Sequence, residues 1–223
     1  MDKGSLAIGF DMDGTLLRTD VDYAKIFWVV YDGMMEAGVP KSELSQMDGP
    51  RSNIDIGVEY LVKAGRSEDV PMIMERIRKG MKDVELENHG TARPYEGAER
   101  MLQYLKDKGY RIGVLTRGSR EYATKALTVA GVMDMLDALV CRDDGDESEA
   151  KPSPIAMERL AAALGVRTTD ILYIGDHRMD YICARDSGAG FIGVLTRNID
   201  DYWSSVDRDI TVIDTVTDLM RLL

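Results

Sequence analysis

The sequence predicts an α/β fold, a doubly wound parallel sheet with a second, α-helical domain inserted near its start. A short apolar run at residues 6–10 ends in Asp11, Asp13 and Gly14, a pattern typical of a buried strand that breaks into a turn. Residues 19–93 then show only helical spacing of apolar side chains. From residue 95 onward helix and strand patterns alternate, which implies parallel strands with helices on both faces.

The inserted segment carries three helical patterns separated by turn-forming or polar residues. These helices are expected at residues 21–38, 54–64 and 70–86, with a polar linker at residues 42–53. Because no part of the segment has a strand pattern, we expect a small helical domain over residues 19–93, with residues 1–18 and 94–223 forming the α/β domain. The core of the helical domain is expected to include Trp28, Tyr31, Met34 and Met35.

The α/β domain is expected to place its functional residues where its strands stop, because ligands of open α/β sheets bind outside the carboxyl ends of the strands. Its helices are expected at residues 98–108, 120–130, 154–164 and 179–186, and near the C-terminus. Its later strands are expected at residues 111–115, 138–141, 171–174, 191–195 and 210–213.

Polar side chains do gather at these predicted strand ends. Asp11 and Asp13 follow the first strand, and both can point to one side of the strand end because side chains alternate along extended backbone. Further candidates follow three later strands: Thr116, Lys151, Asp176 and Asp180. Chance would rarely supply all of these segments at strand ends, so we expect a single site.

Two carboxylates held so close together favour a bound cation or a retained proton. Mg²⁺ prefers carboxylate and carbonyl oxygens and takes remaining ligands from water and substrate phosphate. The expected ligands are Asp11, the backbone carbonyl of Asp13, Asp176, and Asp180 through a water molecule. Gly14 would let the backbone turn closely around a bound oxyanion.

This set of residues supports phosphoryl transfer. Asp11 can attack phosphorus to form an aspartyl-phosphate. Asp13 can protonate the departing oxygen and later deprotonate the attacking water. Thr116 would hydrogen-bond the phosphoryl group, and Lys151 would neutralise its developing charge.

Each candidate also has a purely structural interpretation. Thr116 could be a helix cap, Lys151 a solvated lysine, and the Asp176–Asp180 segment a cap for the helix that follows it. His177, which has no obvious partner in the sequence, is interpreted as a bystander. The acidic run at residues 143–149 is expected to be a solvated loop near Lys151.

Composition narrows the possible partners. The 223 residues include 28 Lys and Arg against 39 Asp and Glu, a formal net charge of −11, which argues against a nucleic acid or an anionic membrane as partner. The two cysteines, Cys141 and Cys183, are too few for a disulfide framework or zinc site. We expect them to be buried in a cytoplasmic protein. The N-terminal residues lead straight into the first strand, so neither a signal peptide nor a membrane-spanning helix is expected.

Residues 11–15 (Asp-Met-Asp-Gly-Thr), Thr116, residues 151–154 (Lys-Pro-Ser-Pro) and residues 175–180 resemble the four motifs of the haloacid dehalogenase superfamily. The helical insertion after the first motif is similar to the small cap domain of the phosphoglycolate phosphatase and β-phosphoglucomutase-like branch. The resemblance implies a Rossmann-like core and the same roles for the matched residues. True dehalogenases of the superfamily lack the second aspartate and need no metal, so Asp13 argues against dehalogenation.

The chain departs from the family pattern after the second motif. Arg117 stands where many relatives carry Asn. It either adds positive charge at the site or faces solvent, and we slightly favour solvent. Residues 49–52 resemble the position of a substrate-contacting cap loop. Arg51 is therefore a candidate to bind a distal anionic group of the substrate, although an exposed arginine before a helix fits the pattern equally well.

The resemblance implies a Mg²⁺-dependent phosphatase that hydrolyses a small phosphorylated metabolite, similar to phosphoglycolate phosphatases, through an aspartyl-phosphate. A phosphosugar mutase is the alternative, for which His89 in the cap region gives only slight support. A phosphate-accepting receiver module ranks well below both, because a receiver is shorter and has no such insertion. We expect the cap to move about hinges near residues 18–19 and 92–95. The substrate, and the choice between monomer and homodimer, stay open.

Overall fold

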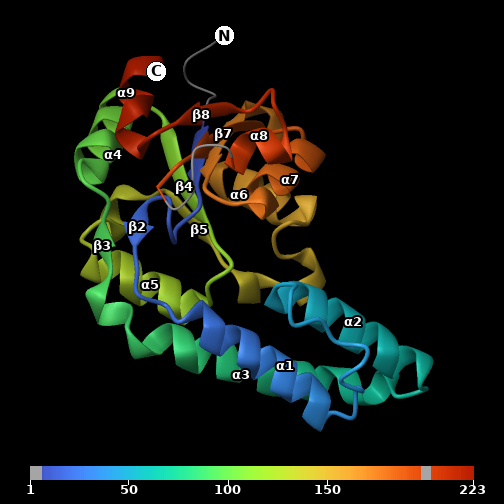
Figure 1. Cartoon of the computed structure of the whole chain (residues 1–223). Coiled ribbons are helices and arrows are strands. Elements are labelled where there is room, and N and C mark those ends of the chain that lie inside the picture. Colours follow the sequence, from blue (N-terminus) through green and yellow to red (C-terminus); the bar gives the residue numbers. More distant parts are fainter. Residues whose placement is uncertain (1–6, 197–201) are drawn as a thin grey trace. The chain divides into compact units, whose positions relative to one another are not determined.

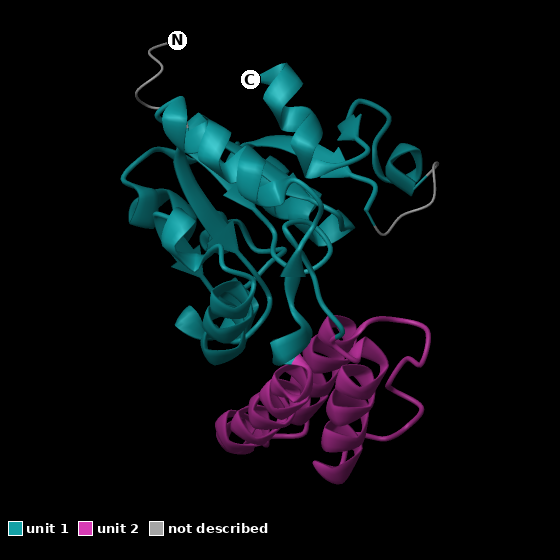
Figure 2. Cartoon of the chain, turned by 90° about the vertical axis from the view of Figure 1, so that its left-hand side faces the viewer, with its two compact units in different colours: residues 1–20, 89–223 teal, residues 21–88 magenta. Residues whose placement is uncertain are grey.

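A computed structural model describes residues 7–196 and 202–223 of the chain. It divides into two compact units, shown in different colours in Figure 2. Unit 1 comprises residues 1–20 and 89–223, and unit 2 comprises residues 21–88. Unit 2 lies within residues 19–93, the segment in which only helices were expected, and its assignment as a cap domain stays a prediction.

A six-stranded parallel sheet forms the centre of unit 1 (Figure 1), which confirms the predicted α/β fold. Its strands are β1 (Ala7–Phe10), β4 (Arg111–Leu115), β5 (Ala138–Val140), β6 (Ile171–Gly175), β7 (Gly190–Val194) and β8 (Thr211–Ile213). They lie in the order β5-β4-β1-β6-β7-β8. All of β1 is buried, as expected of the central strand of a sheet covered on both faces.

Helices cover both faces of this sheet. The helices of unit 1 are α4 (Ala98–Asp107), α5 (Arg120–Val129), α6 (Pro154–Leu164), α7 (Arg178–Ser187), α8 (Tyr202–Val206) and α9 (Leu219–Leu222). Helices α6 and α7 pack against each other and against the strands of one face, and α4 lies on the opposite side (Figure 1). Gly9 and Gly113 allow α6 to approach closely, because a Cβ atom at either would lie 3.0 or 2.7 Å from the Leu160 side chain.

The strand order reverses between β1 and β6. From β1 the chain builds outward through β4 to β5, then crosses back and places β6 on the other side of β1. In doubly wound sheets ligands bind at this switch point, outside the carboxyl ends of the strands. Asp11 directly follows β1 and Asp176 directly follows β6, so the fold brings the first and fourth motifs together.

A second, two-stranded sheet borders the segment of residues 19–93, and the expectation that this segment contains no strand was wrong only for its last residue, Arg93. Its antiparallel strands are β2 (Leu17–Arg18) and β3 (Arg93–Pro94). Strands of two residues are too short to show an alternating pattern in the sequence. In unit 1 this pairing brings together the two chain segments that lead to unit 2.

Unit 2 consists of three helices, α1 (Tyr23–Glu36), α2 (Pro50–Lys63) and α3 (Val70–Glu87). Helix α2 begins four residues earlier than expected, because Pro50 is suited to the first helical position. Tyr31 and Met34 are buried as predicted. The prediction was wrong for Trp28 and Met35, which are 47% and 40% exposed, because they lie off the face of α1 that packs against α2 and α3.

Seven short 3₁₀ turns complete the described structure: η1 (Ser67–Asp69), η2 (His89–Thr91), η3 (Met133–Met135), η4 (Arg142–Asp144), η5 (Glu147–Glu149), η6 (Thr168–Asp170) and η7 (Val216–Asp218). Within residues 7–196 and 202–223, none of the helices combines the length and the apolar character that crossing a membrane requires.

Candidate active site

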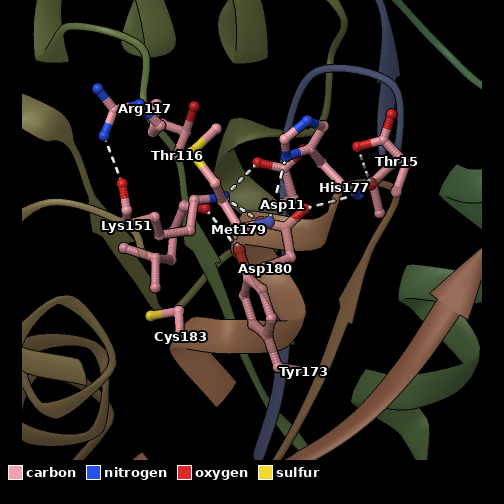
Figure 3. Close-up of polar contacts among 12 residues, drawn as sticks. Asp11, Thr15, Thr116, Arg117, Lys151, Tyr173, His177, Met179, Asp180 and Cys183 are labelled. Carbon is pink, nitrogen blue, oxygen red and sulfur yellow. Dashed lines mark hydrogen bonds and ion pairs between the residues drawn. The ribbon is translucent and has the colours of Figure 1, made fainter. Parts of the chain in front are cut away.

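A buried lysine between two buried aspartates lies at the switch point (Figure 3). The Nζ atom of Lys151 donates to Asp11 Oδ1 and to Asp180 Oδ1, both at 2.6 Å. Asp11 is 7% exposed, Lys151 3% and Asp180 2%. They come from the end of β1, the loop before α6 and the first turn of α7, so three segments far apart in the sequence meet here.

The lysine has a third partner that the sequence analysis missed. Its Nζ atom donates to the hydroxyl of Tyr173 at 3.0 Å, and this hydroxyl donates to the carbonyl of Leu115 at 2.7 Å. An ammonium group has three donors, so these contacts occupy all of them. Tyr173 lies on β6, and the apolar run around it predicts only a core residue. No local sequence pattern indicates where its hydroxyl points.

Burial and charge shift the pKa values of this cluster in opposite ways. Burial raises the pKa of Asp11, the ammonium of Lys151 lowers it, and the charge of Asp180 raises it, leaving it above its usual value. Burial lowers the pKa of Lys151, but Asp11 and Asp180 together hold it well above its usual value. The lysine therefore stays charged over the whole physiological pH range.

Three carboxylates of the site could hold a metal ion. Asp11, Asp176 and Asp180 each offer an oxygen, and these atoms all lie within 4.8 Å of one another. Such hard oxygen donors fit Mg²⁺, which binds through a few carboxylates and keeps several waters. The Thr15 hydroxyl lies 3.4 Å from Asp176 Oδ1 and can steady that ligand. The donor set agrees with the predicted metal site, with the side chain of Asp13 outside it.

The carboxylate of Asp13 has different partners. Its Oδ1 atom accepts hydrogen bonds from the hydroxyls of Thr19, at 2.7 Å, and Tyr122, at 2.6 Å. Neither partner was expected from the sequence, because Tyr122 lies 109 positions away on α5 and its spacing there indicates only a buried helix face. Two hydroxyls thus orient the side chain of Asp13.

Two glycines shape the backbone around these carboxylates. Gly14 has a φ of 89°, a left-handed conformation that favours glycine, and its N–H donates to the carbonyl of Leu17 at 2.8 Å. At Gly175 a Cβ atom would lie 2.4 Å from the Cβ of Asp180. Glycine at this position therefore lets α7 bring Asp180 against the end of β6.

Thr116 lies at the end of β4 with its side chain buried. Its hydroxyl oxygen accepts a hydrogen bond from the Gly118 N–H at 2.9 Å, which fixes the turn after the strand. The cap of the following helix is Ser119, so the helix-cap interpretation of Thr116 was wrong. A hydrogen bond from Thr116 to a phosphoryl group of the substrate stays a prediction.

Arg117 does not face solvent, contrary to the favoured interpretation. Its side chain is 21% exposed, pairs with Glu147 Oε1 at 2.7 Å and donates to the carbonyl of Lys151. Glu147 is itself 5% exposed, so the acidic run was wrongly expected to be solvated throughout. Its charge is also close to that of buried Arg142, with 3.8 Å between Arg142 Nε and Glu147 Oε2. These contacts tie the turn after β4 to the loop that carries Lys151.

Arg51 and His177 have local partners. Arg51 lies in the first turn of α2 in unit 2, where its Nε donates to Asp55 Oδ2 at 2.8 Å. His177 is the N-terminal cap of α7: its Nδ1 accepts from the Met179 N–H at 3.2 Å, and its own N–H donates to Asp180 Oδ2 at 3.0 Å. Asp180 therefore caps the helix, as its structural interpretation expected, and also contacts Lys151. Its role as a metal ligand stays a prediction.

Comparison with known proteins gives a consistent family. The family model described as haloacid dehalogenase-like hydrolase matches residues 8–194. The chain is 24% identical over 216 residues to Pyrophosphatase PpaX of Halalkalibacterium halodurans, covering 96% of this chain and 94% of that protein. It is 29% identical over 187 residues to a phosphoglycolate phosphatase of Cereibacter sphaeroides, covering 82% and 81%. It is 30% identical over 186 residues to N-acetylmuramic acid 6-phosphate phosphatase of Pseudomonas aeruginosa, covering 82% and 78%.

Solved structures share the fold along the whole chain. One, described as a predicted phosphoglycolate phosphatase from Haemophilus somnus, has a TM-score of 0.63 and 18% identity and covers 100% of this chain and 99% of its own. Another, provisionally assigned as a β-phosphoglucomutase from Thermotoga maritima, has a TM-score of 0.62 and 18% identity and covers 97% of each chain. At these identities the likeness concerns the fold alone.

Proposed function

The chain belongs to the haloacid dehalogenase-like hydrolase family, and we propose that it hydrolyses a small phosphomonoester through an aspartyl-phosphate on Asp11. The observation that carries the proposal is the buried arrangement at the switch point. Asp11 follows the central strand, Lys151 lies 2.6 Å from it, and Asp176 and Asp180 complete a carboxylate cluster around it. A nucleophile, a cation and a metal-binding set are thereby in one small volume.

In the first half-reaction a carboxylate oxygen of Asp11 forms a bond to phosphorus while the bond from phosphorus to the ester oxygen breaks. Asp13 gives its proton to the departing oxygen, which leaves as an alcohol. The side chain of Asp13 is suited to this transfer because its hydrogen bonds to Thr19 and Tyr122 fix its position.

In the second half-reaction water attacks the phosphorus of the aspartyl-phosphate. Asp13 takes a proton from that water, the bond from phosphorus to the Asp11 oxygen breaks, and inorganic phosphate leaves. Both residues then return to their starting states. The same carboxyl group serves as acid and then as base.

Lys151 and Thr116 are proposed to act on the phosphoryl oxygens. The Lys151 ammonium is charged and desolvated, so its attraction for the transferring group is strong. Because Asp11, Asp180 and Tyr173 occupy its three donors, a phosphoryl oxygen must replace one of them. Mg²⁺ bound by Asp11, Asp176 and Asp180 would supply further neutralisation of phosphoryl charge.

The substrate is proposed to be a small metabolite similar to phosphoglycolate. The named relatives act on substrates as different as pyrophosphate and a phosphorylated amino sugar, so the family leaves the molecule open. Unit 2 is proposed to be the cap domain, with Arg51 as the candidate contact for a second anionic group of the substrate. Arg117 is proposed to hold Lys151 in place by donating a hydrogen bond to the backbone carbonyl of Lys151. The cytoplasmic location expected from the cysteines stays a prediction.

The test is phosphate release from a panel of phosphomonoesters, including phosphoglycolate, sugar phosphates, nucleoside monophosphates and p-nitrophenyl phosphate, with Mg²⁺ and with EDTA. We expect Mg²⁺-dependent release that Asp11→Asn abolishes. Transfer of phosphate to a sugar hydroxyl in place of water would favour the mutase. Stable phosphorylation of Asp11 without turnover would favour the receiver, and metal-independent release would contradict the proposed mechanism.

A further inference from the structure

We infer that Tyr122 is a positioning residue for Asp13. Its hydroxyl and that of Thr19 both bind one oxygen of the Asp13 side chain. The proton that Asp13 gives to the leaving group is then carried by the other oxygen. The inference rests on the proposed function and adds to it a residue outside the four motifs.

The contact joins two distant parts of unit 1. Tyr122 belongs to α5, is 1% exposed, and donates its hydroxyl proton to Asp13 Oδ1 at 2.6 Å. The Thr19 hydroxyl donates to the same oxygen at 2.7 Å. Two hydroxyl donors therefore converge on a single atom of Asp13.

This convergence has a stereochemical consequence. A carboxylate oxygen offers about two lone-pair directions, and the two hydroxyls fill both directions at Oδ1. While both hydroxyls donate to Oδ1, a proton carried by Asp13 resides on Oδ2. The carboxyl group also cannot rotate without breaking both hydrogen bonds. The acid is thus held in one orientation toward its substrate.

Helix α5 gives Tyr122 a rigid base. A Cβ atom at Gly118 would lie 2.8 Å from Tyr122 Cδ1, so the ring packs closely on the turn after β4. The Gly118 N–H binds the Thr116 hydroxyl at 2.9 Å. The residue that orients Asp13 therefore rests on the turn that carries the second motif, and groups on rigid elements are held more precisely than groups on loops.

A simpler explanation is that a buried tyrosine hydroxyl needs an acceptor and uses Asp13 as one. In that case loss of the hydroxyl would lower stability and slow all substrates alike. A positioning role instead affects those substrates whose leaving group needs a proton. The two explanations therefore differ in the dependence of the rate on the leaving group.

The experiment compares Tyr122→Phe with the wild type on two esters, p-nitrophenyl phosphate and an alkyl phosphomonoester that the wild type hydrolyses. The parameter is kcat/KM, because it reports the transfer to Asp11 and not the later hydrolysis. General acids contribute large factors only where the leaving group needs a proton. We therefore expect kcat/KM to fall about 10- to 100-fold for the alkyl ester and by no more than about threefold for p-nitrophenyl phosphate.

Tyr181→Phe is the matched control. It removes another tyrosine–aspartate hydrogen bond of unit 1, from Tyr181 to Asp207, and should leave both kcat/KM values nearly unchanged. In an Asp13→Asn background, adding Tyr122→Phe should not change the ratio between the two esters further, because that side chain has no acidic proton to position.

An equal loss on both esters, or no loss on either, would overturn the inference. If circular dichroism shows that Tyr122→Phe does not fold, Thr19→Val takes its place, because it removes the other donor to the same oxygen. Thr19→Val should then lower kcat/KM selectively for the alkyl ester. If it does not, the inference is overturned. A wild type that hydrolyses neither ester would refute the proposed function itself, a failure distinct from those of the variants, and the inference would fall with it.

Discussion

At the scale of single residues, the site depends on one buried cation that balances two buried carboxylates. Lys151 contacts Asp11 and Asp180 at 2.6 Å each, and all three side chains are almost fully withdrawn from water. Breaking such a cluster by removing one partner leaves an uncompensated buried charge, which is far more costly than losing a surface ion pair. Lys151 is thus important for stability as well as for the proposed chemistry.

Lys151→Met should abolish turnover and destabilise unit 1 by about 3–5 kcal/mol at neutral pH, since two buried carboxylates lose their counter-charge. Lys125→Met, which removes an exposed pair with Glu121 on α5, should cost only roughly 0.3–0.5 kcal/mol. Thermal melting in EDTA measures both. Equal melting temperatures for the two variants would contradict the assigned role of Lys151.

The loss of folding stability caused by Lys151→Met should also grow as the pH rises. Burial and Asp180 raise the pKa of Asp11, and Lys151 is the group that lowers it. Without the lysine, the folded-state pKa of Asp11 lies further above its unfolded value, so the folded state holds the proton more tightly and stability falls as pH rises through that window, from about 4 upward. Melting temperatures of variant and wild type should therefore diverge between acidic and neutral pH.

The two cysteines make a separate pH prediction. Burial raises the pKa of Cys141 and of Cys183 to about 12. Both thiols should react with a thiol reagent at neutral pH only after denaturation. Because the unfolded thiols lose their protons near pH 9 and the folded ones do not, their contribution to stability declines as pH rises from there toward about 12. Fast labelling of the native protein would contradict the buried placement.

The chemistry-bearing residues could be predicted because their types and their places at strand ends are local features of the sequence. Asp11, Lys151, Asp176 and Asp180 do meet in the structure. Partners that orient them could not be predicted in the same way. Tyr122 and Tyr173 reach the site through tertiary packing, over sequence separations of 109 and 22 residues from their partners, and their local patterns indicate only buried positions.

At the scale of elements, the junction between β6 and α7 sets the position of the fourth motif. Gly175 ends the strand, His177 caps the helix, and Asp180 lies in its first turn. A side chain at Gly175 would meet Asp180 at 2.4 Å. The strand and helix can therefore approach this closely only with glycine between them.

Gly175→Ala should displace Asp180, reduce turnover strongly and cost about 1–3 kcal/mol of stability through overpacking. Gly90→Ala is the matched control, because a Cβ atom there would meet nothing within 4 Å. Phosphate release and thermal melting measure the two effects. A Gly175→Ala variant with normal turnover would show that the position of Asp180 is not critical.

The periodicity of apolar residues predicted the longer helices and strands. It did not predict very short strands, or burial that depends on contacts between distant segments. Helix α6 has the expected bounds, Pro154–Leu164, because proline and an apolar stripe mark it locally. Strands β2 and β3 were missed because they contain two residues each. The buried Glu147 in an acidic run was missed because its ion-pair partner Arg117 comes from the turn after β4, a contact that the local sequence does not show.

At the scale of the whole molecule, unit 2 is inserted between two segments that already pair with each other. Leu17 pairs with Pro94 and Arg18 with Arg93 in unit 1. The site residues at the switch point, Asp11, Lys151, Asp176 and Asp180, all belong to unit 1. The proposed catalytic residues and the proposed substrate-selecting domain are therefore separable in sequence.

Replacing residues 21–88 with a short Gly-Ser linker should leave unit 1 folded, because the β2–β3 pairing holds the two ends together. The shortened chain should keep α/β circular dichroism and bind Mg²⁺. Its preference among the phosphomonoesters of the panel should disappear, since the proposed cap would be missing. Retention of the full substrate preference would contradict the role proposed for unit 2.

The central claim is that phosphate passes through Asp11, and the most direct measurement is mass spectrometry of the protein after acid quenching during turnover with Mg²⁺. The account predicts one phosphoryl group on the peptide that contains Asp11, absent in Asp11→Asn and in EDTA. Turnover without any phosphorylated protein, or a phosphoryl group on a different residue, would contradict it.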